Sequence, residues 1–299
     1  MLRQSHRREE ALGKYVPAVL ETRPSGTELA GKAWRSLREA FAAMPLFYFG
    51  AFLIYSLAVV GPIAITGYLT SATTEAHSLL SQTVFSVFTL FLPSVLSLGA
   101  VAVAAVATHR FILLDDRCPK FERNALQFFL WLLFLAVIFS FLETIKVFEK
   151  KAMPDSGLTD IFGGAIWITK VTVAVHFVLL FPSVAVGEQA GGWRDRIETS
   201  WRRMTGNFWI FLGGDIVAVF PIVLVLLLGM LLSLALFRIM HGQDFSDSMR
   251  LWGTSAEIFR DLIGFWIMMI QAAIASWLYA WVRQQPNPAL EQSSDIMPS

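Results

Sequence analysis

Residues 107–117, ATHRFILLDDR, contain the side chains in this sequence best suited to catalysis or metal binding. One imidazole, His109, precedes two adjacent carboxylates, Asp115 and Asp116, and Arg110 lies between them. Such groups can bind a metal, or act as acid and base on a lipid headgroup at a membrane surface. Alternatively, the segment marks a membrane boundary, with Arg110 among the headgroups, His109 in the same polar layer and both aspartates in water. We favour the boundary because a site needs converging ligands, and we predict no metal or cofactor.

His176 and Asp215 are a second candidate pair, because each lies inside a long apolar run. An ionisable group in hydrocarbon is unfavourable unless it is paired or hydrated. At about 1.5 Å per helical residue, the two lie roughly 16 and 10 Å from the same ends of consecutive runs, so contact is feasible. Gly213 and Gly214 would admit a close neighbour beside Asp215. The pair is either a polar path for a proton or substrate, or a structural contact, and both interpretations stay open.

Four further charged residues, Glu143, Lys170, Arg260 and Asp261, lie near the opposite ends of their runs. Their depths are roughly 5 to 13 Å, a difference that a lysine side chain can span. We therefore expect one charge-balanced cluster. We favour a structural role for it, because much of the cluster is within snorkelling reach of water.

These candidates must be positioned by helices that cross a membrane. The chain of 299 residues is 55% hydrophobic and only 16% charged, a balance that a water-soluble surface does not allow. A bilayer core of about 30 Å needs roughly 20 apolar helical residues, and six runs are long enough. The runs are residues 44–69, 83–108, 125–145, 161–187, 208–237 and 258–282. They are continuous rather than alternating, which predicts an all-α polytopic membrane protein and not a barrel.

The distribution of positive charges predicts the membrane topology of the chain. Seventeen of the 24 Lys and Arg residues fall in the N-terminal segment, the second and fourth loops and the C-terminal tail, against five on the other side. Because cytoplasmic loops are enriched in these residues, both termini are predicted to be cytoplasmic and the six spans to form three hairpins. The predicted parts are a cytoplasmic segment with an amphipathic helix (1–43), the transmembrane domain (44–283) and a cytoplasmic tail (284–299).

Two amphipathic helices are expected before the first and fifth spans. Residues 26–44 and 193–209 both carry apolar side chains, Trp among them, at three- and four-residue steps, with charges on the opposite face. Thr27 is the expected N-cap of the first helix. Helices of this kind lie flat at a membrane surface, so contact with anionic lipid headgroups is predicted, and no contact with nucleic acid.

The entries to the spans form an internal repeat. The first and fifth spans both follow an amphipathic stretch and both contain a proline, Pro62 and Pro221. A shorter version of the entry precedes the third span. Pro93 and Pro182 are expected to kink the second and fourth spans. Such duplication is common in transporters, but it is also a simple way to build a helix bundle.

At ATHRFILLDD (107–116) and SWRRMTGNFWIFLGG (200–214) the chain resembles a group of uncharacterised bacterial six-span inner-membrane proteins. That group is distantly similar to the membrane domain of glycerophosphodiester phosphodiesterases. The resemblance implies a location in the inner membrane. It does not imply phosphodiesterase activity, because the catalytic domains of those enzymes have His-Arg-Gly and Pro-Glu-Asn motifs, and this sequence has HRF and lacks PEN.

Three hypotheses of function follow. The leading one is a non-enzymatic accessory or structural factor of the cell envelope. The second is a small transporter or channel with a polar path through His176 and Asp215, which a continuous cavity at these residues would favour. The third is an enzyme acting on lipid headgroups at the cytoplasmic interface, which convergence of His109, Asp115 and Asp116 would favour. A filled bundle with neither feature would favour the first.

Overall fold

The computed structural model describes residues 23–72, 92–117, 123–152, 158–188, 192–241 and 245–285, and every regular element within them is an α-helix. The helices are α2 (Gly26–Ala43), α3 (Pro45–Ala72), α5 (Leu92–Leu114), α6 (Arg123–Ala152), α7 (Leu158–Phe177), α8 (Leu180–Ala185), α9 (Trp193–Thr205), α10 (Phe208–His241) and α11 (Phe245–Gln284). The prediction of an all-α fold is confirmed. Most of the predicted N-terminal segment and of the predicted tail lies outside the described residues.

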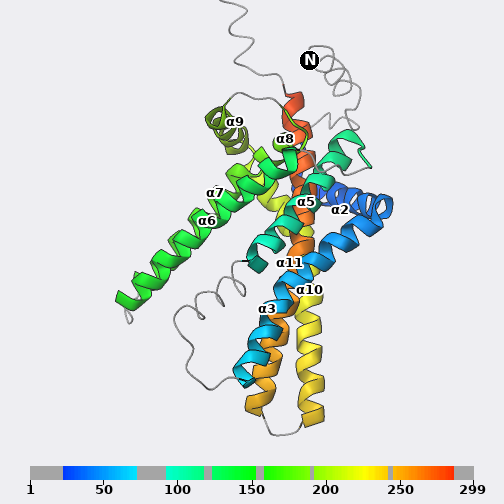
Figure 1. Cartoon of the computed structure of the whole chain (residues 1–299). Helices are drawn as coiled ribbons and strands as arrows, with labels where there is room; N and C mark the ends of the chain where they lie inside the picture. The colour runs from blue at the N-terminus through cyan, green and yellow to red at the C-terminus, as the bar shows by residue number, and fades with distance from the viewer. Residues whose placement is uncertain are drawn as a thin grey trace, which may run out of the picture.

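Six helical segments among the described residues are long and apolar enough to cross a bilayer. They lie in α3, α5, α6, α7 with α8, α10 and α11, and they pair along the chain as three hairpins (Figure 1). The chain is therefore a multi-pass membrane protein. The first nine residues of the predicted second span, 83–91, lie outside the described part of the chain.

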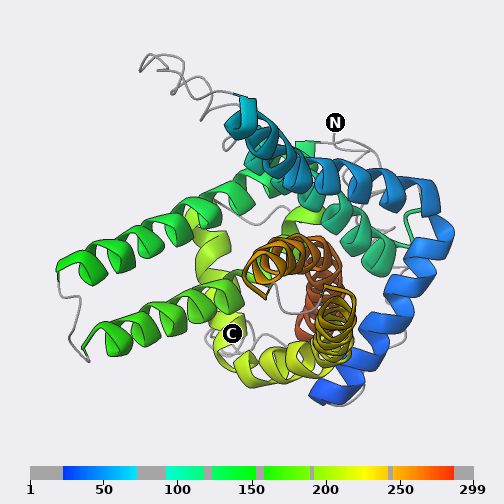
Figure 2. The same cartoon turned by 90° about the horizontal axis from the view of Figure 1, so that it is seen from below.

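Helix α11 is the centre of the bundle. It contacts α2, α3, α5, α8 and α10, and Figure 2 shows these neighbours around it. Its small residues Ala273 and Ser276 are fully buried, as is Ala104 on α5. Small side chains let two membrane helices approach closely, as α5 and α11 do here.

The α6–α7 hairpin extends away from the other two hairpins. In Figures 1 and 2 it diverges from the α3–α5 and α10–α11 hairpins toward its own loop. Only 17% of the span residues of α6 are buried, against 56% in both α5 and α11. Its outward side chains are large and apolar, as hydrocarbon requires of a helix with no protein neighbour there. Examples are Leu130, Phe134 and Trp167.

The two amphipathic helices form as predicted, α2 before α3 and α9 before α10. Helix α2 lies across the bundle and packs on α10 and α11, while α9 packs on α7 and α8. The expected cap at Thr27 is wrong. Ser25 is the N-cap, because its extended backbone lets its side chain accept a hydrogen bond from the Glu28 amide at 3.2 Å, and Thr27 already lies in the first turn. We refer to the end of the bundle that carries α2 and α9 as the α2/α9 end.

Proline interrupts the helix of the fourth span. The predicted kink at Pro182 is confirmed, because α7 ends at Phe177 and α8 begins only at Leu180. Proline has no amide proton and its ring collides with the carbonyl four residues earlier, which is that of Val178 in the interruption. Pro93 is the second described residue of α5, and the kink expected there stays a prediction because the residues before Leu92 lie outside the described part of the chain. Pro62 and Pro221 lie inside α3 and α10.

Candidate functional site

A cavity of about 340 Å³ lies between α5, α6, the α7–α8 junction and α11. Its walls are apolar except for two side chains, His109 of α5 and Gln271 of α11. The apolar lining includes Leu98, Ala105, Phe128, Leu135, Phe181 and Met268. This volume falls at the lower end of the range of small-molecule sites, about 300–1,000 Å³, and an apolar wall with a few polar groups is typical of such sites.

The rotation of each helix about its own axis determines which of its side chains face the cavity. On α5, Ala105 and His109 are four residues apart and so lie on one face, which is turned toward α11. The ring of Phe128 lies 5.6 Å from that of His109 and 4.8 Å from that of Phe181, measured between centroids. These aromatic contacts close the wall of the cavity between α5, α6 and α8.

His109 is enclosed by side chains inside the bundle. It is 1% exposed, and its Nδ1 is 2.7 Å from Ser276 Oγ. Ser276 donates its single proton to the Ala272 carbonyl at 2.9 Å, so this network assigns the His109 bond to an Nδ1–H donor. In that tautomer Nε2 is an acceptor, and no described residue hydrogen-bonds to it. The apolar run ends at residue 108, but the helix does not, because α5 continues to Leu114.

The other members of the ATHRFILLDDR segment form local ion pairs at the end of α5. Arg110 holds Asp116 through two nitrogens, at 2.8 and 2.7 Å, and Arg117 lies 3.4 Å from Asp115. Neither aspartate lines the cavity. His109, Asp115 and Asp116 therefore do not converge. The intervening residues 111–114 were expected to follow the membrane surface, but they belong to α5, and Ile112 is buried.

Asp215 is connected to the cavity through Gln271. Gln271 Nε2 donates to Asp215 Oδ2 at 3.1 Å, and Asp215 Oδ1 is buried without a hydrogen-bond partner among the described residues. The expected close neighbour of Gly213 and Gly214 is the first turn of α2. A Cβ on Gly26 would lie 2.8 Å from the Gly214 nitrogen, so only glycine fits there.

His176 is not brought to Asp215 by any hydrogen bond in the described part of the chain. Its Nδ1 is 2.8 Å from the Thr172 carbonyl, and its ring stacks on Trp201 of α9 at 4.0 Å between centroids. Its own carbonyl accepts from Ser200 at 2.7 Å. His176 does not line the cavity, and its contacts attach α9 to α7.

The four outer charges form two ion pairs. Lys170 of α7 pairs with Glu143 of α6, and Arg260 pairs with its neighbour Asp261 on α11 at 2.9 Å. Tyr55 of α3 donates to the Asp261 carbonyl at 2.8 Å. No ion pair or hydrogen bond among the described residues links one pair to the other. Each pair has a clear structural use, since one joins α6 to α7 and the other lies where α3 meets α11.

Sequence reasoning missed the uncharged polar residues of the interior. Besides Gln271 and Ser276, Tyr48 and Thr108 share a buried hydrogen bond of 2.8 Å between α3 and α5. The signal was present, because Gln271 and Ser276 interrupt the apolar run MMIQAAIAS. Neither residue is ionisable, so charge within an apolar run does not single them out.

Within the described residues no three His, Cys, Asp or Glu side chains form a group able to hold a metal ion. No protein-family model, no curated protein and no solved structure matches the chain. The resemblance to the six-span inner-membrane group therefore stays a prediction. The arrangement of the cavity carries the functional argument instead.

Proposed function

We propose that the chain is a non-enzymatic protein of the bacterial inner membrane that binds the hydrocarbon part of a lipid or another lipid-soluble amphiphile in the cavity between α5, α6, α8 and α11. The observation that carries this proposal is the chemistry of the lining, which is apolar except for His109 and Gln271. An apolar cavity excludes water, because water needs two to four polar partners. Hydrocarbon is the ligand that matches such a wall in a membrane.

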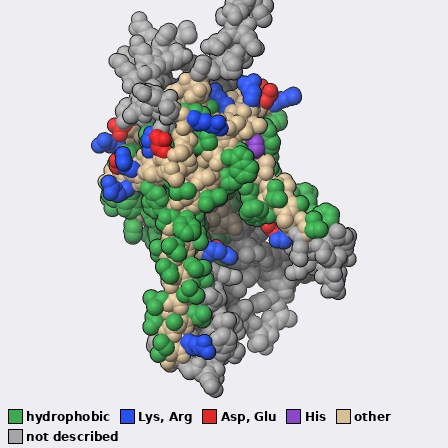
Figure 3. Space-filling view, turned by 180° about the vertical axis from the view of Figure 1, so that it is seen from behind, with side chains coloured by type: hydrophobic (Ala, Val, Ile, Leu, Met, Phe, Trp, Pro, Cys, Tyr) green, Lys and Arg blue, Asp and Glu red, His purple; other side chains and the backbone are tan. Residues whose placement is uncertain are grey.

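The shape of the bundle supports entry from the lipid. The α6–α7 hairpin diverges from the other two, and the face seen in Figure 3 is hollowed between it and the α10–α11 hairpin. The proposed route for an acyl chain is on this side. A hydroxyl or amine on the ligand could then reach the Nε2 acceptor of His109, which gives the site a polar contact as well.

Both termini and the α2/α9 end are proposed to face the cytoplasm. The support is the distribution of Lys and Arg, 17 against 5 between the two sides. The contact of α2 and α9 with anionic headgroups follows from the same orientation. A role in the envelope that depends on lipid binding is consistent with an accessory protein.

The proposal is tested by filling the cavity. Ala136 lines it and is half-buried, so Ala136→Phe adds an aromatic ring to the site. Ala235→Phe, on the exposed face of α10, is the matched control. A fluorescent fatty-acid analogue titrated into the detergent-solubilised full chain should bind the control like the parent and Ala136→Phe at least tenfold more weakly. Equal binding by all three proteins would refute the proposal.

A transport role is the second candidate, and Asp215 supports it. A buried carboxylate oxygen without a partner is uncommon and is often found in proton and ion pathways. His176 adds no support, since its ring is held by Trp201. An uptake assay in proteoliposomes would separate the candidates, because Asp215→Asn abolishes transport but leaves lipid binding intact. The headgroup-enzyme hypothesis has no comparable support, because its three residues lie apart.

A further inference from the structure

A second open site lies on the other side of α11 from the cavity, where α2 crosses the bundle. Six residues line a groove of about 710 Å³: Trp34, Arg35, Leu37, Arg38, Phe41 and Trp266. Five come from α2 and Trp266 comes from α11. We refer to it as the α2 groove.

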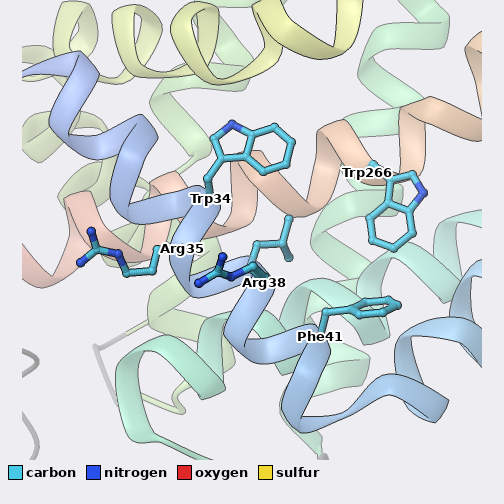
Figure 4. Close-up of a pocket in the computed structure, with 6 residues that line it drawn as sticks. Trp34, Arg35, Arg38, Phe41 and Trp266 are labelled. Atoms are coloured by element: carbon cyan, nitrogen blue, oxygen red, sulfur yellow. The ribbon is translucent and has the colours of Figure 1, made fainter. Parts of the chain in front are cut away.

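The α2 groove has a basic part and an aromatic part. Arg35 and Arg38 are one turn apart on α2, and in Figure 4 both side chains extend to the same side of the helix. Phe41 and Trp266 lie at the other side, with their ring centroids 5.7 Å apart. Trp34 lies between these parts, and its indole donates to the Ala218 carbonyl of α10 at 3.1 Å, which fixes the ring.

The two arginines are unpaired within the described part of the chain. Lys32, one turn earlier, already pairs with Glu28 at 3.2 Å, so its charge is neutralised. Neither Arg35 nor Arg38 forms an ion pair with a described carboxylate, and both are exposed. Two guanidinium groups at this spacing present a fork of donors that matches the oxygens of a phosphate.

We propose that the α2 groove binds one anionic phospholipid, with its phosphate on Arg35 and Arg38 and an acyl chain against Phe41 and Trp266. A neutral lipid would leave the arginines unused, and a soluble anion would leave the aromatic wall unused. Tryptophan at the headgroup level and basic side chains beside it are the groups that fix lipids at a membrane surface. The site differs from the apolar cavity, so it rests on the orientation proposed above but not on lipid binding in that cavity.

The test measures retention of two phospholipids, phosphatidylglycerol and phosphatidylcholine, on the full-length detergent-solubilised protein by native mass spectrometry. The variant is Arg35→Gln with Arg38→Gln. The matched control is Arg194→Gln with Arg202→Gln on α9, which removes the same charge from exposed positions of the other amphipathic helix. Gel filtration and circular dichroism report whether each protein is folded.

A basic residue at a membrane surface changes the affinity for anionic lipid about fivefold, so the variant should bind phosphatidylglycerol about 30-fold more weakly. The retention of phosphatidylcholine should be unchanged, and the control, which removes basic charge from the headgroup-facing helix α9 but none from the α2 groove, should lose far less phosphatidylglycerol than the variant. If the double variant elutes abnormally, the single changes provide the test, each with an expected loss of about fivefold. An equal loss in the control would mean that surface charge alone explains the effect, and it would overturn the proposal. Displacement of the phospholipid by millimolar glycerol phosphate would also overturn it, because the site would then take a soluble anion.

Discussion

The contact between α2 and α10 allows a stringent test of the packing. An added Cβ at Gly26 would lie 2.8 Å from the Gly214 nitrogen and 2.9 Å from the Gly213 carbonyl carbon. Both atoms belong to the backbone of a long helix and cannot turn aside. An ordinary contact needs at least 3.4 Å, so in Gly26→Ala the first turn of α2 must move away by about 0.6 Å. Overpacking of this kind costs about 1–3 kcal/mol.

Gly31, on the same helix, is the matched control, because a Cβ there would meet nothing within 4 Å. Gly31→Ala should stabilise α2 by about 0.5–1 kcal/mol through helix propensity alone. The two alanine variants should therefore differ by about 1.5–4 kcal/mol, with opposite signs relative to the parent. Thermal unfolding of the detergent-solubilised chain, followed by tryptophan fluorescence, should place the midpoint of Gly26→Ala several degrees below that of Gly31→Ala. A Gly26→Ala protein as stable as Gly31→Ala would refute the close packing of α2 on α10.

Two further predictions concern the hydrogen bond between Gln271 and Asp215 and the orientation of the chain in the membrane. Gln271→Leu leaves Asp215 without its hydrogen-bond donor and should destabilise the chain by about 1–3 kcal/mol. Adding Asp215→Leu should recover most of that loss, because no buried carboxylate is then left unpaired. Unfolding of the single and double variants checks this, and strictly additive changes in stability would contradict it. For the orientation, a cysteine introduced at Glu75 in a Cys118→Ser background should react with a membrane-impermeant maleimide added to intact cells, and protection of that cysteine would contradict the orientation.

The helices could be predicted from the sequence because lipid imposes a simple rule. A run of about 20 apolar residues must form a helix that satisfies its own backbone, and short loops make consecutive helices neighbours. Depth along the helix also placed Lys170 and Glu143 in one expected cluster of four charges, and these two do pair, although the four residues form two separate ion pairs. These predictions depend on one dimension only, the distance along the membrane normal.

The partners of most interior residues could not be predicted, because they depend on helix rotation. Each residue turns a helix by about 100°, so two groups at similar depth can face opposite sides. His176 and Asp215 illustrate this, since α7 presents His176 to Trp201 and α10 presents Asp215 to Gln271. The place of His109 depended on where α5 ends, which the apolar run alone does not specify.

The central claim is that the cavity between α5, α6, α8 and α11 holds hydrocarbon. The most direct measurement is photo-crosslinking in native membranes with a fatty acid that carries a mid-chain diazirine, followed by mapping of the labelled residues. The account predicts labels on cavity residues such as Leu135, Phe139 and Met268, and their loss in Ala136→Phe but not in Ala235→Phe. Labels confined to the exposed faces of α6, α7 and α10, with no change in Ala136→Phe, would contradict the claim.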